Sequence, residues 1–121
     1  KTKDEAPTFV PEEGLQKVWG DTKIYHELLT MYLDKSGSLI SEISASAFVD
    51  DKIKLTKELR TITDSAGAVR LKEMLSELIN IGNIGEGALF DARLERVVNE
   101  HRMASSAIRE YLEKEDILTT V

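Results

Sequence analysis

The chain has 121 residues, of which 41% are hydrophobic and 31% are charged, a balance that predicts one folded domain. Its 22 acidic and 16 basic residues give a net charge of −6, which disfavours nucleic acid or an anionic membrane surface as the main partner. The absence of cysteine excludes a disulfide framework, a thiolate metal site and a cysteine nucleophile.

The first residues predict a linker followed by a short helix. Residues 1–8 are polar and contain a proline, as expected of a linker or tail within a longer protein. A short helix follows, with Pro11 in its first turn and Gly20 at its end. Phe9 and Trp19 are expected to pack over one end of the domain, because aromatic side chains are usually buried.

Apolar residues at three- and four-residue spacing then predict longer helices. The first covers residues 21–48, with Asp21 as its N-cap and with Ser-Gly-Ser at residues 36–38 as a site for a kink. The next apolar stripe runs through residues 55–78 and changes side near Gly67, which indicates a bend or a change of packing partner.

The glycine-rich stretch INIGNIGEG, residues 79–87, predicts a loop. A final helix is expected over residues 87–114, followed by a tail at residues 115–121 that either frays or docks. Long helices joined by short connections predict an all-α, antiparallel four-helix bundle over residues 9–114. No apolar run approaches the ~20 residues that a membrane span requires.

Three stretches resemble histidine-containing phosphotransfer (HPt) domains: GLQKVWGDTKIYHELLTMYL, AFVDDKIKL and LRTITDSAGAVRLKEMLSEL. Together the similarity covers roughly residues 9–112. The resemblance implies the four-helix bundle of that family and a role in two-component signalling. It also implies a cytoplasmic location, alone or within a larger sensor protein. The implied partner is a receiver domain of a response regulator or a hybrid histidine kinase.

The resemblance is incomplete where the family carries out its chemistry. Arg60 stands in place of the phosphorylated histidine, Thr63 in place of a lysine, and Asp64 in place of a glycine. The positions that match are packing positions, namely Thr61, Ile62, Ser65, Ala66 and Gly67. A guanidinium is permanently protonated and has no lone pair for a phosphoryl group, so Arg60 is not a nucleophile.

The sequence therefore predicts a non-catalytic phosphotransfer-like domain with no cofactor and no metal site. The expected receiver-binding face comprises Lys57, Arg60, Thr61, Asp64, Ser65 and Ala68. Two other interpretations of this face stay open. In the first, Arg60 and Asp64, which are four residues apart, form an ordinary ion pair on a solvated helix. In the second, the face binds another kind of partner.

The two histidines define an alternative, a functional phosphotransfer protein that uses one of them. The apolar pattern places His26 on the solvent side and His101 in the interior, hydrogen-bonded there. Glu95, Glu100 and Glu110 are expected on a solvated face, because the Glu-x-x-His pattern of di-iron bundles is missing. A second alternative is a helical structural or dimerisation module.

Overall fold

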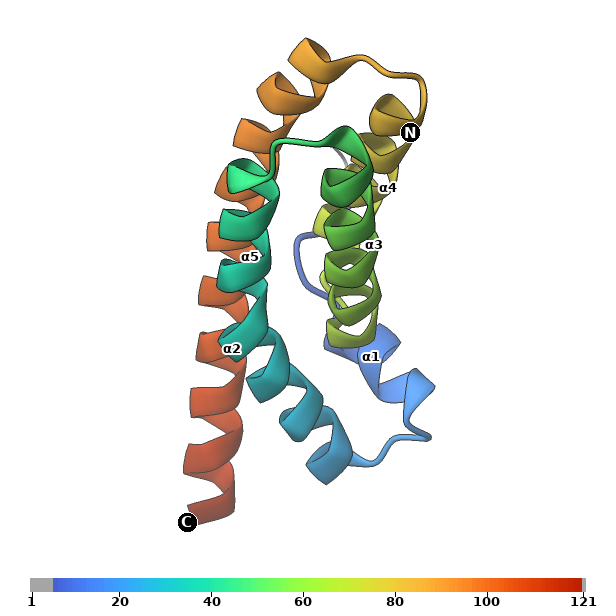
Figure 1. Cartoon of the computed structure of the whole chain (residues 1–121). Coiled ribbons are helices and arrows are strands. Elements are labelled where there is room, and N and C mark those ends of the chain that lie inside the picture. Colours follow the sequence, from blue (N-terminus) through green and yellow to red (C-terminus); the bar gives the residue numbers. More distant parts are fainter. Residues whose placement is uncertain (1–5, 121) are drawn as a thin grey trace.

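The computed structural model describes residues 6–120 of the chain, and the side chains of residues 6–115. Within this part the chain is helical and contains no strand, as an all-α fold requires. The helices are α1 Pro11–Lys17, α2 Thr22–Ala45, α3 Val49–Ala66, α4 Val69–Asn83 and α5 Gly87–Thr120. Helices α3, α4 and α5 each run back along the helix before them, and α1 lies at the end where α3 finishes (Figure 1).

The long helices surround one apolar core, which holds large side chains from all four of them. Fully buried members are Tyr25, Leu29, Tyr32, Ile43, Leu59, Leu71, Leu75, Leu78, Phe90, Val97 and Ile108. No helix in the described part of the chain is both long enough and apolar enough to cross a membrane.

Two residues that the sequence analysis singled out lie at helix boundaries, and one of them was predicted as a boundary. The carboxylate of Asp21 accepts a hydrogen bond from the Ile24 N–H at 3.1 Å, which confirms Asp21 as the N-cap of α2. Gly67 has a φ of 84° and ends α3 in the left-handed conformation. The expected bend near Gly67 is therefore a complete break between two helices.

Two other boundaries differ from the prediction. Helix α2 ends at Ala45, before the expected residue 48, and it is unbroken at Ser36. Helix α4 continues to Asn83 through most of the predicted loop 79–87. Packing explains why α4 extends into the predicted loop. Gly82 is buried against the side chains of Ile53 and Phe90, which leave no room for a side chain at this position of the helix.

The last helix also exceeds its expected length. Helix α5 begins at Gly87 as predicted but continues to Thr120 instead of ending at residue 114. The predicted tail is thus helical in its described part, while residue 121 lies outside the described residues. The side chain of Tyr111, near the far end of this helix, packs against both Phe9 and Tyr25.

The N-terminal segment is attached to the junction between α3 and α4. Arg70 donates hydrogen bonds to the carbonyls of Ala6 and Pro7, and the Val10 N–H donates to Gly67 at 2.8 Å. Residues 6–8 of the expected linker are thus tied to α4, whereas residues 1–5 lie outside the described part. Phe9 covers one end of the domain beside Tyr111, as predicted.

The prediction for Trp19 is wrong, because its side chain is 96% exposed. Trp19 follows α1 in a tight turn with a φ of 58°, a conformation that is unfavourable for a bulky residue. In this turn the Gly20 N–H donates to the carbonyl of Leu15 at 2.8 Å. The turn therefore directs the indole away from the core.

Candidate functional site

The outer face of α3 carries Arg60, which the resemblance aligns with a phosphorylated histidine. Lys57, Arg60 and Thr61 are exposed, and helical spacing places them on one side. The Thr61 hydroxyl donates to the carbonyl of Lys57 at 3.1 Å, and that of Ser65 donates to the carbonyl of Thr61 at 3.3 Å. Both hydroxyls are thereby held against the helix backbone, which leaves the long cationic side chains as the most prominent groups.

The guanidinium of Arg60 has no hydrogen-bond or ion-pair partner among the residues that the structure describes. The ion pair with Asp64 that helical spacing allowed is not formed. Asp64 is engaged elsewhere, so the charge of Arg60 is available to a partner.

Asp64 is held between two lysines from other helices. Lys17 of α1 lies 3.3 Å and Lys72 of α4 lies 3.2 Å from its Oδ1 atom. Lys17 also donates to the backbone carbonyl of Asp64 at 3.1 Å. Partial burial disfavours the charged carboxylate, but the two ammonium groups outweigh this effect and hold the pKa of Asp64 below its usual value.

This arrangement makes the site more positive than the residues of α3 alone indicate. By itself, the negative charge of Asp64 would repel a phosphorylated group. In the structure two cations surround that single carboxylate, and Arg60 is a third cation one helical turn away. Sequence reasoning missed Lys17 and Lys72, because both reach Asp64 only after α1 and α4 have packed against α3.

Two residues that the sequence analysis singled out lie inside the domain. Ala68 is fully buried at the start of α4, so it is not part of the expected exposed face. Thr63, at the position of the family's lysine, is also fully buried, and its hydroxyl donates to the carbonyl of Leu59 at 2.7 Å. The exposed part of the predicted site is therefore Lys57, Arg60, Thr61 and the outer edges of Asp64 and Ser65.

His26 differs from its prediction. It is half-buried, and its Nε2 atom is covered and has no hydrogen-bond partner within the described residues. The ring packs edge-on against Tyr111 at a centroid distance of 5.8 Å. Tyr111 belongs to α5, so the apolar pattern of α2 alone gave no indication of this cover.

His101 is placed as predicted, partly buried and hydrogen-bonded. Its Nε2 atom lies 2.7 Å from the hydroxyl of Ser36 and 3.3 Å from that of Ser105. Burial lowers the pKa of His101, and the positive charge of Arg109 lowers it further. The ring is therefore a neutral hydrogen-bonding group near pH 7.

The prediction for Glu100 is wrong, because this carboxylate is buried and not on a solvated face. Its Oε1 atom lies 3.6 Å from Arg70, and its Oε2 atom has no hydrogen-bond partner within the described residues. Across residues 6–115, no group of three or more acidic or histidine side chains lies close enough to hold a metal ion.

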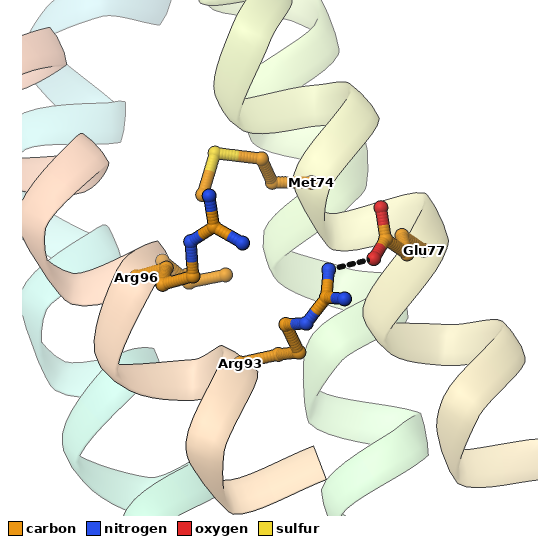
Figure 2. A pocket seen from close by; sticks show the side chains of 5 residues that line it. Met74, Glu77, Arg93 and Arg96 are labelled. Atoms are coloured by element: carbon orange, nitrogen blue, oxygen red, sulfur yellow. Dashed lines mark hydrogen bonds and ion pairs between the residues drawn. The ribbon is translucent and has the colours of Figure 1, made fainter. Parts of the chain in front are cut away.

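A small cavity between α4 and α5 is lined by Met74, Glu77, Arg93, Arg96 and Val97 (Figure 2). Its volume is about 20 Å³, which is space for roughly one water molecule. Arg93 donates a hydrogen bond to the carboxylate of Glu77 across this space. The cavity is therefore a small gap bridged by a contact between α4 and α5, and it is too small to be a ligand pocket.

Comparison of the chain with models of protein families, with curated proteins and with solved structures finds no match.

Proposed function

We propose that the chain is a four-helix-bundle domain of the phosphotransfer type that binds a receiver domain through α3 and accepts no phosphoryl group there. The observation that carries this proposal is Arg60, an exposed cation without a partner among the described residues, at the position of the family's histidine. The succession of α2, α3, α4 and α5 around one apolar core supports the bundle assignment.

The charge around Arg60 supports an acidic partner. The resemblance implies that the partner presents an acidic pocket to this helix, and Lys17, Arg60 and Lys72 complement such a pocket. Arginine is suited to this role, because its planar guanidinium binds carboxylates in a bidentate manner. Since it has no lone pair, the contact ends in binding and not in covalent transfer.

The alternative of phosphoryl transfer through another histidine has less support. The Nε2 atom of His26 is covered, and that of His101 is hydrogen-bonded to Ser36 inside the domain. A receiver domain needs direct access to the accepting nitrogen, so either site requires a local opening of the helices.

Binding is tested by titrating receiver domains of the same organism with the chain and with Arg60→Glu. Charge reversal is expected to weaken binding by at least ~1.5 kcal/mol, about tenfold, since a charge-assisted contact is replaced by repulsion. Arg102→Glu is the matched control, because Arg102 is an exposed arginine on α5, away from this face. Equal affinities of the chain and Arg60→Glu would contradict docking through α3.

Transfer is tested on the same samples by intact mass after incubation with phosphorylated receiver domains. Binding without added phosphoryl mass is the expected result. An acid-labile adduct would instead establish transfer through His26 or His101. If no receiver domain binds and the chain self-associates, the structural or dimerisation alternative is favoured.

A further inference from the structure

One end of the domain exposes large apolar side chains, which together we call the apolar end: Phe48, Val49, Ile84 and Leu89. They belong to the connections between α2 and α3 and between α4 and α5 and to the helix starts that follow, which lie at the same end of the molecule (Figure 1). The helix starts that follow the two connections are in contact, since Lys52 near the start of α3 lies 3.9 Å from Asp91 near the start of α5. Phe48 and Ile84 are the most exposed of the four, at 71% and 72%.

Phe48 occupies a position where a different residue is favourable for folding. It is the N-cap of α3, and the helix start has no side-chain cap hydrogen bond. Serine, threonine, asparagine and aspartate are preferred at this position, because their side chains satisfy an exposed backbone N–H. A mostly exposed phenylalanine provides neither a cap nor much burial, so the stability of the fold does not explain its presence.

Two open hollows flank the connection that carries Phe48. One, of about 440 Å³, lies between α2 and α3 and is lined by Glu42, Ala45, Ser46, Asp51, Lys54, Leu55 and Glu58. The other, of about 270 Å³, lies between α2, α5 and the start of α3 and is lined by Ser44, Lys52, Asp91, Leu94, Glu95 and Val98.

Acidic groups outnumber basic ones around both hollows. Each hollow has one lysine, and the acidic side chains are Glu42, Asp51 and Glu58 in the first and Asp91 and Glu95 in the second. Apolar side chains contribute to the lining of both. An apolar surface with an acidic rim complements side chains that have apolar contacts and positive charge, and it repels anionic surfaces.

We propose that the apolar end binds a cationic amphipathic helix of a partner protein. Leucine or other large apolar side chains of that helix cover Phe48 and Ile84. Its lysines or arginines reach the acidic side chains of the flanking hollows. This mode of recognition lays an amphipathic helix into an apolar surface and uses charge for orientation. A second copy of this chain fits poorly, because its own apolar end has the same acidic rim.

The centre of this surface is distant from the centre of the face proposed to bind a receiver domain. Phe48 precedes α3 and Arg60 lies 12 residues further along, so the two residues that the tests change are roughly 18 Å apart at ~1.5 Å per residue. The edges of the two surfaces meet at Lys57 and Glu58, and neither residue is changed in the tests. The two proposals are therefore tested independently, and failure of one does not decide the other.

The probe is a labelled leucine–lysine peptide of about 18 residues, with leucine at helical spacing, and its leucine–glutamate counterpart. Fluorescence anisotropy with the whole chain is expected to show binding of the lysine peptide only. Raising the salt concentration from about 50 to about 300 mM is expected to weaken it, because exposed charges are screened. Equal binding of the glutamate peptide would contradict the charge argument.

Phe48→Ser is expected to weaken binding of the lysine peptide about tenfold, as for the loss of a central aromatic anchor. Trp19→Asn is the matched control, since Trp19 is 96% exposed, precedes α2 and is distant from the apolar end. Asp51→Asn is expected to reduce the salt dependence, whereas Asp34→Asn, an exposed change on α2, should not. Circular dichroism confirms that each variant is folded.

Three results would overturn the proposal. The first is equal affinity of the chain and Phe48→Ser for the peptide, or equal loss in Trp19→Asn. The second is concentration-dependent dimerisation of the chain that Phe48→Ser abolishes, which would make a second copy the occupant. The third is binding to anionic lipid vesicles through Phe48, which would make the occupant a membrane.

Discussion

The Nε2 atom of His101 lies 2.7 Å from the hydroxyl of Ser36, and this contact joins α5 to the middle of α2. The ring of His101 also lies beside that of Tyr32, at a centroid distance of 6.0 Å. This site is partly buried and close to a positive charge on Arg109. The neutral form of His101 is thus the form that the folded state favours.

The stability of the domain is expected to fall as the pH falls below about 6.5, the usual pKa of histidine. The pKa of His101 is lowered in the folded state, so over this range the unfolded chain binds more protons. Stability therefore rises with pH through this window and is lost on acidification. Urea unfolding of the chain and of His101→Gln between about pH 7 and about pH 5 tests this, because the variant lacks the titrating group. An unchanged slope in the variant would assign the pH dependence to another group.

Two glycines inside helices are expected to respond in opposite directions to alanine. At Gly82 a Cβ atom would lie 2.7 Å from Cγ1 of Ile53, and overpacking of ~1–3 kcal/mol exceeds a helix-propensity gain of ~1 kcal/mol. Gly82→Ala should lower the free energy of unfolding by roughly 1 kcal/mol. Gly37 has no atom within 4 Å of such a Cβ, so Gly37→Ala should raise it by about 0.5–1 kcal/mol. Denaturant unfolding compares both with the parent chain; a loss of stability in both would contradict the packing argument.

Tyr25→Phe is expected to lower the free energy of unfolding by about 1–2 kcal/mol. The Tyr25 hydroxyl donates a 2.6 Å hydrogen bond to the carbonyl of Ala66 at the end of α3. In the variant this buried carbonyl would have lost its hydrogen-bond donor. Tyr32→Phe is the control. The buried Tyr32 hydroxyl is near Ser36 and Thr63 but makes no hydrogen bond of good geometry within the described residues, so its removal should be nearly neutral. Equal losses in both variants would mean that the loss comes from the space left by a buried hydroxyl and not from the hydrogen bond to Ala66.

Phe48→Ser is expected to raise the free energy of unfolding by about 0.5–1 kcal/mol, because serine caps the N-terminus of α3. Together with weaker peptide binding, this result would show that the wild-type residue favours recognition over stability. Thermal unfolding is the measurement. A variant less stable than the parent chain would show that the partial burial of Phe48 matters more than the missing cap.

Arg60→His alone is not expected to give efficient phosphoryl transfer. The new imidazole would be exposed on α3, but the side chain of Asp64 would occupy space that a glycine leaves open one helical turn away. The buried Thr63 would supply no positive charge. Intact mass after incubation with a phosphorylated receiver domain tests this. Rapid and acid-labile labelling of this variant would show that position 60 is the only barrier to transfer.

The sequence alone determined the features that depend on neighbouring residues. Apolar repeats at helical spacing predicted the long helices, Asp21 predicted the start of α2, and Gly67 predicted a break in direction. The interior position of His101 followed from the same periodicity. These features are predictable because helical hydrogen bonds, caps and left-handed glycines act within a few residues.

The tertiary structure alone decided which charges meet and which side chains are covered. Lys17 and Lys72 reach Asp64 from two other helices, and the pair between Arg60 and Asp64 that their spacing allowed does not form. Tyr111 covers His26 from a helix far along the chain. The physical reason is that each helix can rotate about its axis until it packs, and only packing fixes which residues of distant segments come within contact distance.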